Sequence, residues 1–198
     1  MAEDRPKKIS RRTLLRGAGV AGAAAAAGSV GLSASPEALT VPLPEQSSAA
    51  ELPPVAYEHL TAEEAELLEA IADHLIPADE YGPGALEARA VAYIDRALGG
   101  ALSDSHDAYR SGLAAFDRYC RASRGGPFLG LSNRDQVSAL IDVEIGSATG
   151  AATGFAGSSA AFFSMVRSHV LQGTFGDPYY GGNANFVGFD LLGYPGVR

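Results

Sequence analysis

The stretch Leu60–Pro77, LTAEEAELLEAIADHLIP, decides the fold class. Thr61 and Glu64 stand at the spacing of a capping box, in which each side chain bonds to the backbone amide of the other residue, and this predicts a helix start. Pro77 ends the run because proline cannot continue a helix. The apolar residues between these signals recur at three- and four-residue spacing, as on one face of a helix: Leu67, Leu68, Ile71, Leu75 and Ile76.

The same pattern predicts four more helices toward the C-terminus. Their expected extents are Leu86 to Leu98, Ser103 or Asp104 to Arg124, Ser132 to Ile145, and Ser158 to about Leu171. Their expected buried faces are, in order, Leu86, Val91, Ile94 and Leu98; Tyr109, Leu113, Phe116 and Cys120; Val137, Leu140, Ile141 and Ile145; Phe162, Phe163, Val166 and Val170. No stretch alternates for long enough to predict a strand. We therefore expect an all-α chain, a compact bundle of about five helices.

Residues 173–198 differ from the rest and are expected to form an irregular tail. They contain seven glycines and six of the sixteen aromatic residues of the chain. Such a segment has too few aliphatic residues for its own core and too many rings for a flexible linker. It either folds back over the helices or forms a surface that another chain covers, and both can hold at once.

The charge of the chain argues against nucleic acid as a partner. Residues 1–35 carry six Lys or Arg and only Glu3 and Asp4 as acids, a net charge of +4. The whole chain carries −8, so the remainder carries −12. Such an acidic body repels phosphate backbones and anionic membrane surfaces. The single cysteine, Cys120, excludes an intrachain disulfide and the metal or haem sites that need several thiolates.

Residues 1–35 have the architecture of an export signal, with a basic stretch, an uncharged Ala/Gly-rich run and a patch of small residues. The run is too short and too weakly hydrophobic for a stable membrane span. The basic stretch resembles the twin-arginine export motif, in Ser10, Arg11, Arg12, Leu14 and Leu15. This route exports proteins that have already folded. We therefore expect the chain in the periplasm or on the outer face of the cytoplasmic membrane. A basic tail without a targeting role is the alternative.

Residues 36–56 contain five prolines and are expected to form an extended linker. The preceding Gly17–Gly22 fits the GxGxxG pattern of dinucleotide-binding proteins. That pattern binds a pyrophosphate only between a strand and a helix, whereas here it follows the twin arginines. We therefore expect no nucleotide site in this chain.

His74 is the first residue that could suggest a metal site, together with Asp73, Asp79 and Glu80. Helical geometry places Asp73 on a different side from His74, and Pro77 separates the other two acids from it. The ordinary interpretation is a histidine at a helix C-terminus, where it interacts favourably with the helix dipole. We expect no metal site there.

His169, Asp177 and Tyr179 could form an acid–base pair, but Asp177 is better explained as the cap of a turn with Pro178. Cys120 lies within a predicted helix without a histidine nearby, and no serine stands in a GxSxG sequence. We therefore expect no catalytic residue in this chain.

Residues 57–198 contain a set of short motifs: Thr61–Glu64, Ala72–Asp79, Gly82–Ala85, Ile94-Asp95, Gly173–Asn183, Gly188-Phe189 and Gly193–Gly196. With these motifs the segment resembles the gluconate 2-dehydrogenase subunit 3 family, the small or gamma subunits of membrane-associated FAD-dependent sugar dehydrogenases. One departure is Phe189, where many members are expected to have tryptophan.

The resemblance implies a non-catalytic subunit of a periplasmic oxidoreductase. A large flavoprotein holding FAD would oxidise a sugar or sugar acid, and a multihaem cytochrome c would receive the electrons. This chain would hold no cofactor, and its signal would carry the flavoprotein through export. The residues expected to bind the flavoprotein are Phe175, Asp177, Pro178, Tyr179, Tyr180, Gly181, Gly182 and Asn183. A free-standing periplasmic enzyme and a transient assembly chaperone are the alternatives.

Overall fold

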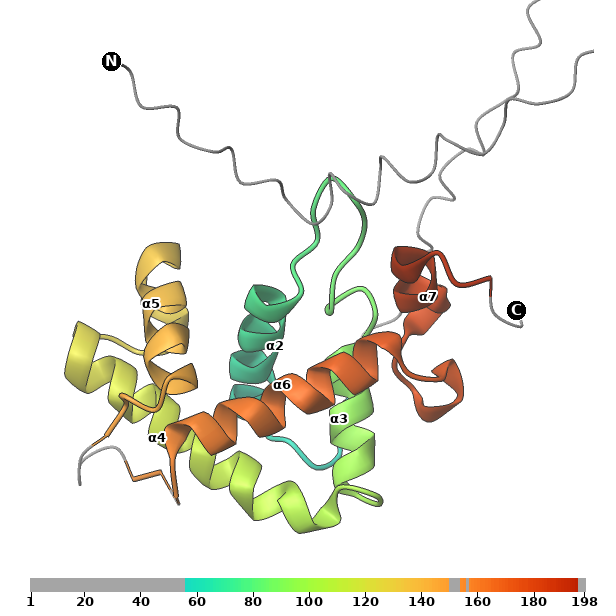
Figure 1. Cartoon of the computed structure of the whole chain (residues 1–198). Coiled ribbons are helices and arrows are strands. Elements are labelled where there is room, and N and C mark those ends of the chain that lie inside the picture. Colours follow the sequence, from blue (N-terminus) through green and yellow to red (C-terminus); the bar gives the residue numbers. More distant parts are fainter. Residues whose placement is uncertain (1–55, 150–153, 156, 196–198) are drawn as a thin grey trace, which may run out of the picture. The chain divides into compact units, whose positions relative to one another are not determined.

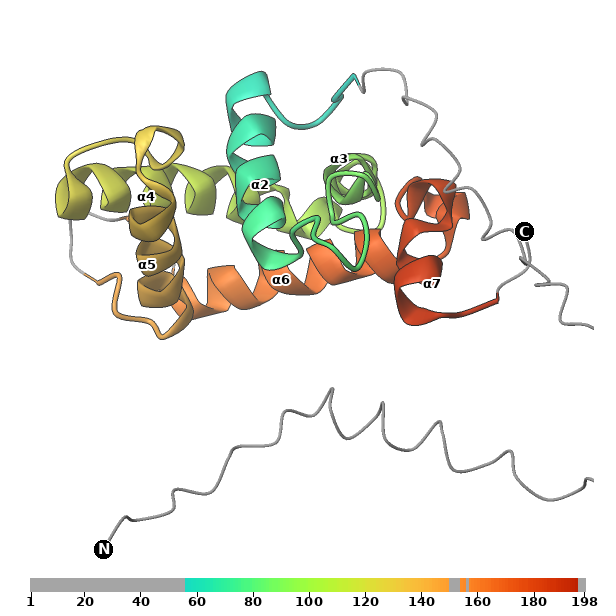
Figure 2. The same ribbon diagram turned by 90° about the horizontal axis from the view of Figure 1, so that it is seen from above.

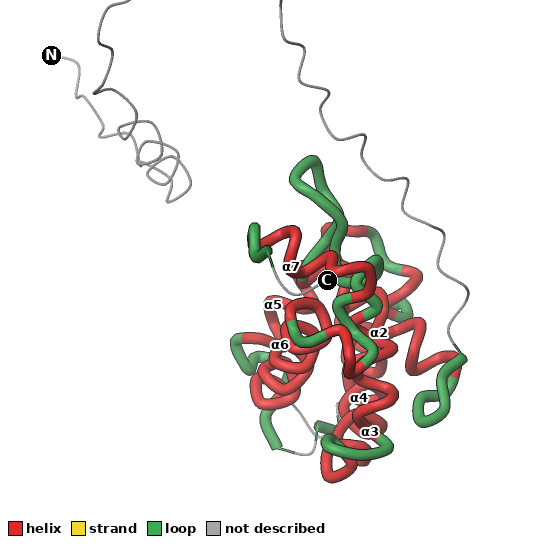
Figure 3. Tube along the Cα trace, turned by 90° about the vertical axis from the view of Figure 1, so that its right-hand side faces the viewer, coloured by secondary structure: helices red, strands yellow, loops and turns green. Residues whose placement is uncertain are grey.

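The computed structural model describes residues 56–149, 154–155 and 157–195. The export motif at Ser10–Leu15 and the linker up to residue 55 lie outside these residues, as does Gly196 of the last family motif. The described part confirms the all-α prediction, since it contains helices and no strand (Figure 3). Within it, no helix is long and apolar enough to cross a membrane.

Six α-helices form the described domain, the last of them short. Their bounds are α2 Ala62–Leu75, α3 Ala90–Leu98, α4 His106–Arg124, α5 Asn133–Glu144, α6 Ser159–Phe175 and α7 Val187–Leu192. Single 3₁₀ turns lie at Ser103–Ser105, Phe128–Gly130, Pro178–Tyr180 and Ala184–Phe186.

The first helix, α2, forms as its sequence predicts. The Thr61 side chain accepts from the Glu64 amide, and the Glu64 carboxylate accepts from the Thr61 amide at 2.9 Å. The helix ends at Leu75, with Ile76 as its cap directly before Pro77. Leu67, Leu68 and Ile71 are buried, as expected, so the capping box and proline fix both ends of the helix.

The long helix α6 organises the domain, because it contacts α2, α3, α4, α5 and α7. Figures 1 and 2 show α4 and α5 near one end of α6 and α3 and α7 near its other end. Phe163, Val166 and Val170 bury the inner face of α6, while Phe162 is partly buried. The most extensive of these contacts is with α3.

The predicted face of α4 is also confirmed, since Tyr109, Leu113, Phe116 and Cys120 are all buried. Burial raises the pKa of the Cys120 thiol to about 12. A thiol with so high a pKa is not a nucleophile at neutral pH.

The prediction for α3 was wrong at its start, because the helix begins at Ala90 rather than at Leu86. Arg89 has a left-handed backbone conformation with φ of 55°, which separates the preceding turns from the helix. Leu86 is exposed in those turns, whereas Ala85 and Ala88 are buried. Small residues are therefore in the core where the pattern predicted a leucine.

The prediction for α5 was wrong about its face. Of the four apolar residues expected to be buried, Leu140 alone is, while Val137, Ile141 and Ile145 are exposed. Asp142 accepts a hydrogen bond from the Tyr119 hydroxyl at 2.7 Å and pairs with Arg124 of α4. These contacts lower the Asp142 pKa, the Tyr119 bond most strongly. They turn Asp142 toward α4 and bring Ala139 and Val143 into the core instead.

The boundary between α6 and the tail also differs from the prediction. The helix continues past Leu171 to Phe175, so that Gly173, Thr174 and Phe175 belong to it. The tail beyond is not irregular throughout, because it contains two 3₁₀ turns and α7.

Asp95 of α3 is a buried residue whose role sequence analysis missed. Its carboxylate accepts hydrogen bonds from the backbone amides of Glu58, His59 and Leu60, at 2.8–2.9 Å. A buried carboxylate is stabilised when several amides donate to it. Asp95 thereby fixes the segment that leads into α2. Its position between Ile94 and Leu98 on the apolar face of α3 was the available signal.

Candidate functional site

The C-terminal segment folds back over the end of α6, and Asn183 fastens it there. The Asn183 side chain donates to the Gly176 carbonyl at 2.8 Å and accepts from the Gly188 amide at 2.7 Å. Its backbone amide donates to the Gly173 carbonyl. The residue is fully buried and has a φ of 44°, a conformation that asparagine tolerates better than most residues. Asn183 therefore connects the last turn of α6 to the first residues of α7.

Two glycines allow the backbone to approach this closely. A Cβ on Gly182 would lie 2.2 Å from the Gly173 carbonyl oxygen, and a Cβ on Gly188 would lie 1.9 Å from the Thr174 carbonyl oxygen. Any side chain at either position would push the segment away from α6. The next amide, that of Ala184, donates to the Ala88 carbonyl at 3.0 Å, so the tail is also joined to the turns before α3.

Residues 177–181 form an exposed turn between α6 and Asn183, which we refer to as the tyrosine loop. Asp177 caps it by accepting from the Tyr179 amide at 2.9 Å, as predicted. Gly181 closes it with a φ of 96°. Tyr179 is 84% exposed and Tyr180 is 60% exposed, with their rings edge to face at a centroid distance of 5.3 Å. Two large rings therefore face solvent on a short, internally bonded loop.

The eight residues expected to bind a partner divide into two groups. Asp177, Tyr179 and Tyr180 are exposed and available for contact, whereas Gly182 and Asn183 are buried and hold the loop from beneath. The remaining three, Phe175, Pro178 and Gly181, are partly buried. The arrangement thus separates exposed residues from supporting residues, and the binding role of all eight stays a prediction.

Further apolar residues near the C-terminus are exposed. Phe189 packs between Phe186 and Tyr194, with centroid distances of 6.1 and 5.1 Å. Tyr194 and Leu192 are themselves exposed. This ring cluster includes the position at which tryptophan was expected, and sequence analysis did not assign it a role.

The 79–82 turn adds another exposed tyrosine to this end of the domain. Asp79 and Gly82 exchange backbone hydrogen bonds of 2.9 and 3.1 Å, which present Tyr81 to solvent. A Cβ on Gly82 would lie 2.8 Å from a Leu191 methyl group, so the turn lies against α7. The sequence motif at Gly82–Ala85 gave no role to Tyr81.

The residues considered for acid–base chemistry are placed differently from that hypothesis. His169 is buried, and its Nδ1 hydrogen-bonds to the Tyr109 hydroxyl at 3.0 Å. Burial lowers the pKa of His169 below its ordinary value and raises the pKa of Tyr109. Asp177 instead caps the tyrosine loop. His169 therefore serves as a neutral core residue that links α6 to α4.

His74 likewise has a structural environment. Its Nε2 lies 3.0 Å from Oε1 of Gln136, and its ring stands edge-on to Phe128 at 5.9 Å. Among the described residues, no group of three His, Cys, Asp or Glu is arranged to hold a metal ion.

A groove of about 500 Å³ lies between α2 and α4. Its charged residues include Glu64 and Arg110, which are 3.9 Å apart, and Asp117 and Arg121, which are 2.7 Å apart. Glu63 and Glu66 also line the groove, so its four acids and two arginines give it a net negative charge.

Replacing Asn183 with alanine tests how the tyrosine loop is held. The change removes two buried side-chain hydrogen bonds, so we expect the free energy of unfolding to fall by about 2 kcal/mol. Denaturant titration measures this loss. Asn185→Ala is the matched control, because Asn185 is exposed and also has a positive φ, 54°. Equal losses in both variants would contradict the role of Asn183.

Comparison with known proteins gives one result. No curated protein sequence and no solved structure matches the chain. A model of one family, described as gluconate 2-dehydrogenase subunit 3, matches residues 62–196. The match begins at α2 and includes the tyrosine loop, Asn183 and α7. The chain therefore belongs to the gluconate 2-dehydrogenase subunit 3 family.

Proposed function

We propose that this chain is the non-catalytic small subunit of an exported FAD-dependent sugar or sugar-acid dehydrogenase. In this role it binds the large flavoprotein subunit and carries it through the twin-arginine pathway. The family supports a place in a dehydrogenase complex. The flavoprotein holds the FAD, and a multihaem cytochrome c is the natural electron acceptor.

The observation that carries the docking role is the pairing of exposed rings with a rigid support. Tyr179 and Tyr180 are exposed, while the backbone beneath them is bonded to α6 through Asn183. Tyrosine buries a large area at small entropic cost, and a preformed loop loses little freedom on binding. Such a surface suits stable attachment to a partner.

The export role rests on the sequence of residues 1–35. Twin-arginine export carries folded proteins, so a flavoprotein can take up FAD in the cytoplasm before it crosses. A flavoprotein without its own signal then has to remain bound to this chain during transit. A well-packed interface of standard size or larger meets that requirement.

The two alternatives are separated from this proposal by simple observations. A free-standing enzyme turns over a sugar without any flavoprotein, and a transient chaperone leaves no stoichiometric complex in the periplasm. An enzyme built on His169 and Asp177 is disfavoured, because both residues have structural partners.

The docking prediction concerns Tyr179→Ala combined with Tyr180→Ala. Co-expression of the tagged chain with the large flavoprotein subunit from the same organism, followed by pull-down, measures recovery of the complex. We expect the double variant to recover at least about tenfold less flavoprotein, because truncated tyrosines at an interface centre are costly. Ile145→Ala is the control, since Ile145 is 69% exposed at the end of α5. Full recovery with the double variant would refute the docking role of the loop.

The export prediction concerns Arg11→Lys combined with Arg12→Lys. We expect dye-linked dehydrogenase activity to reach the periplasm with the native arginines and to remain in the cytoplasm with the lysines. Fractionation followed by an electron-acceptor dye assay measures this. Periplasmic activity in cells that lack this chain would rule out its role as the carrier.

A further inference from the structure

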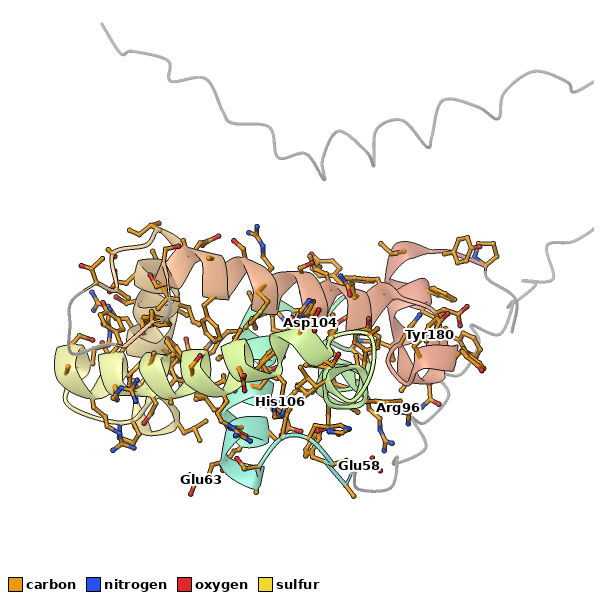
Figure 4. All side chains as sticks on the ribbon, turned by 90° about the horizontal axis from the view of Figure 1, so that it is seen from below. Glu58, Glu63, Arg96, Asp104, His106 and Tyr180 are labelled. Carbon is orange, nitrogen blue, oxygen red and sulfur yellow. The ribbon has the colours of Figure 1, made fainter. Side chains whose placement is uncertain are left out.

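Arg96 of α3 lies beside the tyrosine loop. A Cβ on Gly181 would lie 2.5 Å from Nη1 of Arg96 and 2.8 Å from its Cζ, so the guanidinium rests directly against that glycine. Figure 4 shows Arg96 and Tyr180 at the same end of the domain. The lack of a side chain at Gly181 therefore makes room for the guanidinium next to the two exposed rings.

Arg96 is an exposed residue, and within the described part of the chain its guanidinium has no ion pair or hydrogen bond. Other arginines of the domain are engaged, such as Arg121 with Asp117, Arg124 with Asp142 and Arg167 with Glu144. The nearest acid on the tyrosine loop, Asp177, is occupied as the cap of its turn. Arg96 is thus an available cation in a chain that carries −12 after residue 35.

An arginine beside two exposed tyrosines is a combination typical of binding surfaces. Arginine and tyrosine are the residue types, with tryptophan, that most often dominate interface energies. A guanidinium presents a planar set of donors that matches a carboxylate with two parallel hydrogen bonds. Its position against Gly181 restricts its motion, so less freedom is lost when a carboxylate binds.

We propose that Arg96 binds a carboxylate of the flavoprotein subunit, as the charged centre of a surface whose apolar part is Tyr179 and Tyr180. This inference rests on the proposed function and adds the chemistry of the partner surface: an acidic residue beside an apolar patch that receives the two rings. The chain after residue 35 carries a net negative charge, so it repels an acid on the partner over most of its surface and attracts it at Arg96. This difference favours binding at this face over the others.

Arg96→Glu tests the proposal in the full chain co-expressed with the flavoprotein. Arg134→Glu is the matched control, because Arg134 is an exposed arginine of α5 whose guanidinium is likewise unpaired and the change of charge is the same. We expect Arg96→Glu to reduce recovered flavoprotein at least about tenfold, while Arg134→Glu leaves it unchanged. Arg96→Lys, which keeps the charge, should retain more complex than Arg96→Glu.

The outcomes separate this inference from the proposed function. Recovery of flavoprotein by the unmodified chain, together with equal recovery by Arg96→Glu, overturns the role of Arg96 and leaves the proposed function intact. Equal losses in the Arg96→Glu and Arg134→Glu variants, or in Arg96→Glu and Arg96→Lys, also overturn it. Failure of the unmodified chain to recover any flavoprotein overturns both. Unchanged thermal midpoints in the variants show that any loss arises at the surface.

Discussion

The hydrogen bonds of the buried Asn183 amide hold the segment that follows α6 in place. One side-chain group of Asn183 is bonded to the end of α6 and the other to the start of α7. Both backbone groups they satisfy belong to residues at helix ends, where intrahelical partners run out. Without this bridge the tail would have few aliphatic contacts to keep it on the helices. The position of the tyrosine loop depends on it.

The rest of the domain supplies a rigid base for that bridge. The helix α6 contacts every other described helix, and its last turn lies against α3 at Gly173, where a Cβ would meet the Ala90 carbonyl oxygen at 2.7 Å. Asp95 fixes the chain before α2 against the same helix, α3. The polar contacts thus join segments that helix packing alone would leave loose. A surface built this way keeps its shape without a partner, which lowers the entropic cost of binding.

Sequence analysis succeeded where local signals decide the structure. The capping box at Thr61, the helix start at Ser132 and the face of α4 follow from short-range patterns, and the structure has them as predicted. It failed on α5, where Asp142 bonds to residues of α4 that no local pattern could identify. The motif at Gly173–Asn183 indicated the family, but only the structure separates its exposed tyrosines from its buried asparagine. Arg96 and Gly181 are far apart in sequence, so their contact could not be predicted.

The tyrosine loop and its support are expected to form before the partner binds. Amide hydrogen exchange on the purified full chain, without any flavoprotein, tests this most directly. We expect the amides of Asn183, Ala184 and Gly188 to exchange at least about 100-fold more slowly than in an unstructured peptide. The first two donate to the carbonyls of Gly173 and Ala88 in the body of the domain, and the Gly188 amide donates to the buried Asn183 side chain. Exchange at unstructured rates, slowing only when flavoprotein is added, would contradict it and show that the tail folds on binding.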